Sequence, residues 1–337
     1  MSWLSDEALE RLRAAAVVPD FSGTRYRLQK RLGRGGMGTV FLAEDRMLGR
    51  NVAVKVLDLP DASGELAARM LREARIVAGL EHPGIVPVHD AGTLPDGRVF
   101  YAMKYVQGDR LDQHLPKVSS LADRLRLFLK VCDAVAFAHA HRVLHRDLKP
   151  GNIMVGPFGE VLVMDWGVAK VLSGGSESSE GRPSAENASV VALSRAPETA
   201  HGTVLGTPGY MAPEQARGEI DRIDERSDVF GLGAILRFLL NGRGPGEGAT
   251  AGAEIVVPRA LAAICAKAMS PEPADRYAGA QEVAADVARY LDGLPVSAYP
   301  ENIFQRTGRL LARHRVAVIL ILAYVTARLL LLFLLKR

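Results

Sequence analysis

The chain has 337 residues, of which 48% are hydrophobic and 24% are charged, and its formal net charge is +4. This composition excludes a disordered chain, and the length predicts about two domains or one unit of two lobes. The two cysteines lie far apart in apolar stretches, which excludes a disulfide scaffold, and the small net charge argues against a nucleic-acid partner. Charges near the N-terminus stand where a secretory signal needs an apolar run, so no signal peptide is expected.

The first lobe begins at Tyr26, after an N-terminal extension over residues 1–25. Short runs rich in β-branched and aromatic residues predict strands, and apolar residues at helical spacing predict one helix over Glu65–Leu80. His82-Pro83 ends that helix. The lobe is therefore predicted as a five-stranded sheet with one main helix, the strands being Tyr26–Leu32, Thr39–Ala43, Asn51–Leu57, Val86–Val88 and Val99–Val106.

The second lobe follows Gly108 and is predicted to be mostly helical, which makes the fold class α+β. A long buried stripe runs from Leu121 to His139, and residues 173–189 are so poor in apolar side chains that a flexible segment is expected. The other predicted elements are two short strands, Ile153–Val155 and Val161–Met164, and three helices, Ser227–Leu240, Pro258–Met269 and Ala280–Leu291.

Residues 316–335 form an almost continuous apolar stretch of 20 residues with a single charge, Arg328. A helix of this length spans about 30 Å, the thickness of a membrane's hydrocarbon core. A buried or amphipathic docking helix is the alternative. Four arginines precede the stretch (Arg306, Arg309, Arg313 and Arg315). By the positive-inside tendency they predict a single-pass helix with the large domain in the cytoplasm.

A glycine-rich stretch, Gly33-Arg34-Gly35-Gly36-Met37-Gly38-Thr39-Val40, lies between the first two predicted strands. Glycines let backbone N–H groups approach phosphate oxygens without a side-chain clash. A plain hairpin and a dinucleotide-binding turn are alternatives. The second of these needs a helix after the glycines, and a strand is predicted there.

Lys55 alternates with apolar residues in the third predicted strand, where a surface-facing lysine is the ordinary interpretation. Glu73 lies in the middle of the predicted helix and is able to hold the Lys55 ammonium against phosphate groups. Glu65 and Glu81 lie at the ends of that helix and are poorer candidates.

The stretch His145-Arg146-Asp147-Leu148-Lys149-Pro150-Gly151-Asn152 lies between two apolar runs, as expected of a rigid loop. Its spacing lets Asp147 face a hydroxyl group and Asn152 face a metal ion. Asp165-Trp166-Gly167 ends a predicted strand and suits a metal ligand on a hinge. Gly206-Thr207-Pro208 and Ala212-Pro213-Glu214 close the segment that follows.

These motifs occur in one order, and over about residues 26–292 the chain resembles the eukaryotic-like (Hanks-type) Ser/Thr protein kinases of bacteria. The resemblance implies a bilobal protein-kinase fold plus one C-terminal transmembrane helix. The implied divisions are an N-lobe over 26–106, a C-lobe over 107–292 with an activation segment over 165–214, a basic juxtamembrane linker over 293–315, and the span over 316–335.

The resemblance also implies the roles of the catalytic residues. Asp147 accepts the proton of the substrate hydroxyl, and Lys55, paired with Glu73, orients the phosphates of ATP. Lys149 steadies the γ-phosphate and, with Thr207, favours Ser or Thr over Tyr as the acceptor. The metal ligands are Asn152 and Asp165, and the metal is Mg²⁺ or Mn²⁺.

The implied ATP site has Met103 as gatekeeper, with Lys104 and Val106 offering backbone hydrogen bonds to adenine. The full predicted set is Leu32, Gly33, Arg34, Gly35, Gly36, Met37, Gly38, Val40, Ala53, Lys55, Met103, Lys104, Val106 and Met154. Three further residues have implied structural roles: Arg276 pairs with Glu214, and Asp228 braces the backbone of the catalytic loop.

The implied function is that of an ATP-dependent protein serine/threonine kinase that phosphorylates proteins, including itself, at the inner (cytoplasmic) membrane. Its implied partners are protein substrates, the lipid bilayer through 316–335, and a second copy of the chain in a homodimer. Phosphorylation in the Ser-rich stretch 173–200 is expected to raise activity by giving Arg146 a phosphate to bind.

Two departures from the family pattern keep other functions open. Trp166 replaces the usual Phe, and residues 241–257 form a Gly-rich bridge where the family carries another helix. A membrane-tethered pseudokinase scaffold is the main alternative, and a small-molecule kinase is the other. A metal site at His139, His141 and His145 is not expected, because no carboxylate or cysteine completes a ligand set.

Overall fold

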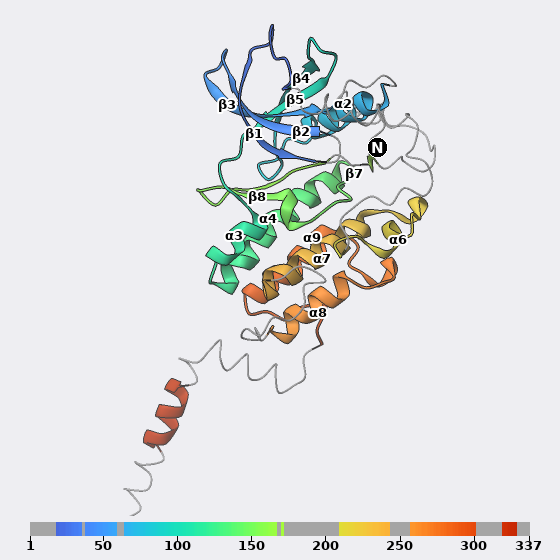
Figure 1. The fold of residues 1–337 in the computed structure, drawn as a ribbon. Coiled ribbons are helices and arrows are strands. Elements are labelled where there is room, and N and C mark those ends of the chain that lie inside the picture. The colour runs from blue at the N-terminus through green and yellow to red at the C-terminus, as the bar shows by residue number, and fades with distance from the viewer. Residues whose placement is uncertain are drawn as a thin grey trace, which may run out of the picture.

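The computed structural model of the chain describes residues 18–35, 38–58, 64–166, 170–171, 209–242, 257–300 and 319–328. In Figure 1 a sheet with one helix forms the upper part of the molecule, and a group of helices forms the lower part. The bilobal α+β fold predicted from the sequence is therefore confirmed in the residues described.

The upper sheet has five antiparallel strands in the order β1-β2-β3-β5-β4. Strands β2, β3 and β5 are rich in the β-branched and aromatic residues that pack well on a pleated surface. Four of the five lie where the sequence predicted them, to within a few residues. The bounds are β1 Tyr26–Arg34, β2 Gly38–Asp45, β3 Arg50–Leu57, β4 Val88–Thr93 and β5 Val99–Lys104.

The strand predicted at Val86–Val88 was wrong in position, because β4 begins where that prediction ends. The Val86 N–H donates to the carbonyl oxygen of Val163 in the lower lobe at 3.3 Å. Pro87 has no N–H to contribute to a strand ladder. The apolar run therefore joins the two lobes, and the more polar residues after it form the strand.

The two faces of the upper sheet are covered by different parts of the chain. Helix α2, Glu65–Ala78, covers one face, where Met70 and Ala74 pack against Leu57 and Tyr101. The other face is covered in part by the end of the N-terminal extension, since the Phe21 ring lies 5.7 Å from that of Phe100. The central strand β3 is thus buried along most of its length, whereas much of the edge strand β1 stays exposed.

The lower lobe is built on α4, Leu121–Ala140, which is the long helix predicted from the buried stripe. Ser120 caps it, because its Oγ accepts the Asp123 N–H at 3.3 Å. Cys132 and Cys265 are free thiols buried in this lobe, as expected for core packing. The other helices are α3 Leu111–His114, α6 Pro213–Ala216, α7 Glu225–Asn241, α8 Arg259–Ala268 and α9 Ala280–Leu291.

Short strands and single helical turns complete the lower lobe, and only two of them were predicted from the sequence. The strands are β6 Asp109–Arg110, β7 Val143–Leu144, β8 Ile153–Val155, β9 Val161–Val163 and β10 Lys170–Val171. The 3-10 turns are η1 Leu115–Lys117, η2 Pro150–Asn152, η4 Ile220–Arg222 and η5 Pro273–Asp275.

Of the apolar stretch 316–335, the structure describes residues 319–328, which are helical with exposed side chains. Within the part of the chain that the structure describes, no helix has both the length and the apolar character needed to cross a membrane. The rest of the stretch lies outside the described residues, as do the Ser-rich stretch 173–200 and residues 243–256 of the Gly-rich bridge.

Candidate active site

Lys55 and Glu73 meet between the upper sheet and α2, as predicted. Lys55 Nζ donates to Glu73 Oε1 at 3.0 Å, and both side chains are buried. Side chains alternate along β3, so Val54 and Val56 pack on the outer face while Lys55 and Leu57 face α2. Strand periodicity and helix periodicity together therefore bring the two charges into contact.

The same ammonium reaches the lower lobe, because Lys55 Nζ also donates to Asp165 Oδ1 at 3.0 Å. Burial opposes the charge of Lys55, but the carboxylates of Glu73 and Asp165 outweigh burial and raise its net pKa. Burial acts to raise the pKa of Asp165, yet the charge and hydrogen bond of Lys55 hold that pKa below its ordinary value. Lys55 is thus a stable cation beside a stable carboxylate.

Tyr101 is a member of this cluster that the sequence reasoning missed. Its hydroxyl donates to Glu73 Oε1 at 2.8 Å, and its ring lies 5.6 Å from Lys55 Nζ. Tyr101 is the direct cross-strand partner of Lys55 in the β3–β5 pairing. The signal was therefore the strand register, which the sequence alone does not supply.

The predicted catalytic loop brings Asp147, Lys149 and Asn152 together. Lys149 Nζ donates to Asp147 Oδ2 at 2.7 Å. The amide nitrogen of Asn152 donates to the Asp147 carbonyl oxygen at 2.8 Å and to its Oδ2 at 3.1 Å. Turn η2 places Asn152 within reach of Asp147, so the loop presents one carboxylate held by two neighbours.

Asp228 in α7 holds the backbone of this loop from below. It accepts the N–H groups of His145 and Arg146, each at 2.8 Å, and His139 Nε2 lies 2.9 Å from its carboxylate. Arg146 has a positive φ of 67°, which few side chains adopt, so its conformation needs such support. Burial favours the neutral form of Asp228, but the His139 hydrogen bond and charge keep its net pKa lowered.

Trp166 is buried in the core of the lower lobe, beside the catalytic loop. Its indole N–H donates to the Val163 carbonyl oxygen at 3.3 Å, which supplies the partner that a buried tryptophan needs. Its ring packs against that of His145 with the centroids 4.6 Å apart. His145 Nε2 in turn lies 3.0 Å from the Met164 carbonyl oxygen. The larger indole is thus accommodated next to Asp165.

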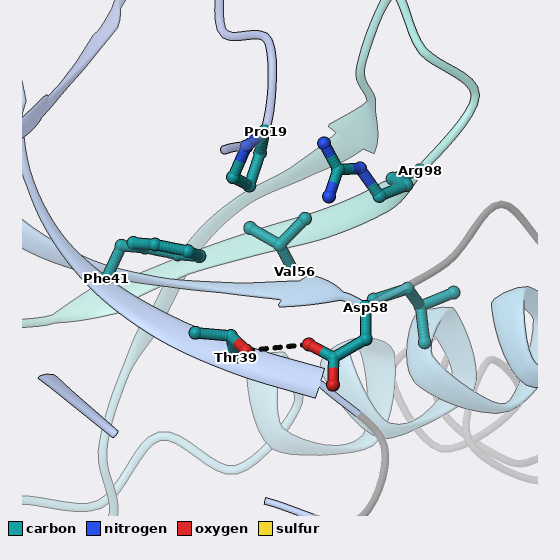
Figure 2. Close-up of a pocket in the computed structure, with 7 residues that line it drawn as sticks. Pro19, Thr39, Phe41, Val56, Asp58 and Arg98 are labelled. Carbon is teal, nitrogen blue, oxygen red and sulfur yellow. Dashed lines mark hydrogen bonds between the residues drawn. The ribbon is translucent and has the colours of Figure 1, made fainter. Parts of the chain in front are cut away.

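The glycine-rich stretch joins β1 and β2 and is attached to the end of β3. A Cβ on Gly38 would lie 2.2 Å from the Val56 carbonyl oxygen, so only glycine fits there. Thr39 Oγ1 donates to Asp58 Oδ1 at 2.6 Å, and Arg34 Nε donates to Asp58 Oδ2 at 2.7 Å. Figure 2 shows the Thr39–Asp58 bond beside a pocket that Pro19, Phe41, Val56, Leu57 and Arg98 also line.

The residues predicted to enclose adenine come from both lobes. Ala53 faces Met103 across β3 and β5, and Val40 faces Lys55 across β2 and β3. Met154 lies on β8 in the lower lobe. Leu32, Gly33 and Arg34 belong to β1 and Gly35 follows it, while Gly36 and Met37 lie outside the described residues.

Lys104 and Val106 lie where the chain passes from the sheet to the lower lobe. The Lys104 N–H donates to the Pro87 carbonyl oxygen at 3.0 Å. This N–H is therefore engaged within the protein, and the predicted hydrogen bond to adenine from this N–H is not supported. Val106 is buried just beyond β5.

Glu214 and Arg276 form a fully buried ion pair in the lower lobe. Arg276 donates to both carboxylate oxygens, at 2.7 and 2.9 Å, and Ser227 Oγ donates to Glu214 at 2.7 Å. Burial alone would raise the pKa of Glu214, but the bonds from Arg276 and Ser227 hold it below the ordinary value. The neighbouring Gln215 donates to the Arg146 carbonyl oxygen at 3.0 Å, which links this pair to the catalytic loop.

Asn152 and Asp165 fit the predicted divalent metal. The Met164 N–H donates to the Asn152 carbonyl oxygen at 2.8 Å, so β8 and β9 bring both residues to one end of their hairpin. The amide nitrogen of Asn152 faces Asp147, which leaves its oxygen, and Asp165 offers a second oxygen of the kind that Mg²⁺ prefers. Among the described residues, no group of three or more His, Cys, Asp and Glu side chains is suited to hold a metal.

Thr207 completes the predicted catalytic set but lies outside the described residues. Its predicted part in acceptor choice therefore stays a prediction.

A model of the protein kinase domain matches residues 26–289 of the chain. The chain is 34% identical over 303 residues to the serine/threonine-protein kinase PknD of Protochlamydia amoebophila (strain UWE25). This match covers 80% of this chain and 30% of the relative. It is 35% identical over 309 residues to the probable serine/threonine-protein kinase PknB of Bifidobacterium longum (strain NCC 2705). This second match covers 82% of this chain and 41% of the relative. The chain thus spans well under half the length of these relatives.

Among solved structures, the Mycobacterium tuberculosis PknI kinase domain matches with a TM-score of 0.56 and 25% sequence identity. The match covers 81% of this chain and 99% of that domain.

Proposed function

The chain belongs to the protein kinase family, and from this premise we propose that it transfers the γ-phosphoryl group of ATP to Ser or Thr hydroxyls of proteins. The observation that carries the proposal is the convergence of three groups on one site. These are the Lys55–Glu73 ion pair, the Asp147 carboxylate with its two neighbours, and Asp165, which accepts a bond from Lys55. A decayed kinase usually lacks at least one of these groups, so the arrangement favours an enzyme over a scaffold.

The chain's own residues perform the proposed reaction by positioning and by charge. Lys55, fixed by Glu73, orients the phosphate tail. The substrate oxygen attacks the γ-phosphorus, the bond to the bridging oxygen breaks, and ADP leaves with that electron pair. Asp147 accepts the hydroxyl proton, and Lys149, which donates to the same carboxylate, supplies a positive charge to the transferred group.

The proposed metal sites are Asn152 and Asp165. A bound Mg²⁺ or Mn²⁺ neutralises charge on the phosphate oxygens. The hairpin of β8 and β9 supports this assignment, because it brings Asn152 and Asp165 to the same end.

The experiment that tests the function uses the full chain in detergent, incubated with labelled ATP and Mg²⁺ or Mn²⁺. The expected result is label on the chain itself or on a generic basic protein, and none with Asp147→Asn. Thermal unfolding checks that the variant stays folded. Absence of label from both substrates with the unaltered chain would reject the proposal and favour the scaffold.

Membrane attachment is a second part of the proposal and has a separate test. The apolar run 316–335 and the four arginines before it support a single-pass anchor in the inner membrane, with the kinase domain in the cytoplasm. Alkaline carbonate should leave the chain with the membrane pellet and should release a variant cut after residue 300. Release of both would contradict the anchor. Self-association as a homodimer and the phosphorylation of stretch 173–200 remain predictions of the family resemblance.

A further inference from the structure

Three buried side chains from three elements meet at one oxygen atom. Glu73 Oε1, on α2, accepts from Lys55 Nζ of β3 at 3.0 Å and from the Tyr101 hydroxyl of β5 at 2.8 Å. The other oxygen, Glu73 Oε2, is buried and has no hydrogen-bond partner among the described residues. The carboxylate is therefore held entirely through one of its two oxygens.

We infer that Tyr101 is a positioning residue for the phosphate-binding lysine. Its hydroxyl fixes the Glu73 carboxylate against Lys55 and so favours the position of α2 in which Lys55 is ready for the ATP phosphates. This inference rests on the proposed function and adds a residue to the ATP site that the family motifs do not name.

The position of Tyr101 in the sheet explains why it is able to do this. It lies directly opposite Lys55 in the β3–β5 register, so its ring lies beside the ammonium with the centroid 5.6 Å from Nζ. Its hydroxyl extends past Lys55 to Glu73. The bond therefore links α2 to the sheet separately from the ion pair, and it stays in place when Lys55 turns toward phosphate.

The hydroxyl is a donor at every physiological pH. Burial raises the pKa of Tyr101 far above its ordinary value; the Lys55 ammonium acts to lower that pKa, but burial and the carboxylates of Glu73 and Asp165 outweigh it. A phenol that never ionises holds the carboxylate without a second charge.

Deleting one oxygen atom tests the inference, and the chain offers a matched control. Tyr101→Phe keeps the ring, its contact with Lys55 and its packing against α2, but removes the bond to Glu73. Tyr277→Phe removes a bond of the same length, 2.8 Å, from an equally buried tyrosine to the Asp286 carboxylate, away from the site. Both variants lose the same chemical interaction.

The affinity for ATP and the KM for ATP should separate the two variants. Without the Tyr101 bond, fewer molecules hold α2 in the position that keeps Lys55 ready for ATP, and the apparent affinity falls with that population. Tyr101→Phe should therefore raise the Kd and KM for ATP roughly tenfold. Its kcat should stay within about twofold at saturating ATP, because ATP restores that state. Tyr277→Phe should lower the melting temperature and leave the Kd for ATP unchanged.

A double-mutant cycle shows whether Tyr101 acts through Glu73. In a Glu73→Ala background, which lacks the acceptor, Tyr101→Phe should change the Kd for ATP no further. The inference is overturned if Tyr101→Phe binds ATP like the unaltered chain, or if its effect is undiminished without Glu73. Binding is measured without turnover, so a failure of this inference is distinct from a chain that transfers no phosphate.

Discussion

The two halves of the candidate active site are held in place by different numbers of bonds. In the upper half, the Glu73 carboxylate accepts two donors on one oxygen, and its other oxygen is buried without a partner among the described residues. In the lower half, Asp228 accepts bonds on both oxygens, and the Glu214 carboxylate has Arg276 and Ser227. The carboxylates of Glu73, Asp228 and Glu214 are all buried, so the difference lies in their hydrogen bonding and not in their exposure.

This difference separates a part that is fixed by folding from a part that is adjustable. The backbone of the catalytic loop is determined whenever the lower lobe is folded, because buried carboxylates without their donors are costly. The position of Lys55 depends on whether α2 keeps Glu73 in place. We expect changes in the lower half to lower stability, and changes in the upper half to alter ATP binding first.

The largest effect is expected from Arg276→Ala, which leaves the Glu214 carboxylate buried without its ion-pair partner. The free energy of unfolding should fall by about 3–5 kcal/mol. The control is Arg222→Ala, whose ion pairs with Glu219 and Glu272 are exposed and should contribute less than about 1 kcal/mol. Urea denaturation measures both. Equal losses from the two variants would show that the lower half is not held by buried charge.

A smaller loss of stability, together with a loss of activity, is expected from Asp228→Asn. The amide places an NH₂ group where the carboxylate accepted donors, so one N–H of the catalytic loop loses its bond, at about 1–3 kcal/mol. Displacement of Asp147 should lower kcat/KM on the order of a hundredfold. Asp221→Asn, an exposed position in η4, is the control. Full activity in Asp228→Asn would show that catalysis does not depend on the bonds between Asp228 and the catalytic loop.

The sequence predicted the parts of this site that depend on local pattern. Alternation in β3 and helical spacing in α2 placed Lys55 and Glu73 in contact, and the loop motif placed Asp147 beside Asn152. Boundaries were less certain, since the apolar Val86 gave a false strand start. The composition of a segment does not reveal that its apolar residues join two lobes.

Tertiary partners were beyond the reach of the sequence. His139 was predicted only as part of a buried stripe, but its ring lies 2.9 Å from Asp228, which is 89 positions away in the chain. Tyr101 likewise depends on the register of two strands that are not consecutive in the sequence. Both contacts depend on how helices and strands pack against one another. The spacing of residues within one segment does not indicate such packing.

Acid should weaken the lower half in a predictable direction. Despite burial, the bonds from Arg276 and Ser227 keep the folded pKa of Glu214 below its unfolded value of about 4.3. Its stabilisation is therefore complete above that value and is lost as the pH falls through the folded pKa, by at most about 1.4 kcal/mol per pH unit. In Glu214→Gln the unfolding free energy should be lower throughout, with a shallower slope below about pH 4.3. An unchanged slope would exclude Glu214 as a source of acid sensitivity.

The smallest effect is expected at the other anchor of the upper half, where Thr39 and Arg34 bind Asp58. Thr39→Val keeps the shape of the side chain but removes its 2.6 Å bond to Asp58, so the free energy of unfolding should fall by about 0.5–1.5 kcal/mol. Because Arg34 still binds Asp58, the glycine-rich loop should loosen only partly, and the KM for ATP should rise about two- to threefold. Thr93→Val, on an exposed position of β4, controls for strand propensity. A rise in KM as large as that of Tyr101→Phe would mean that the loop, and not α2, is the adjustable element of the upper half.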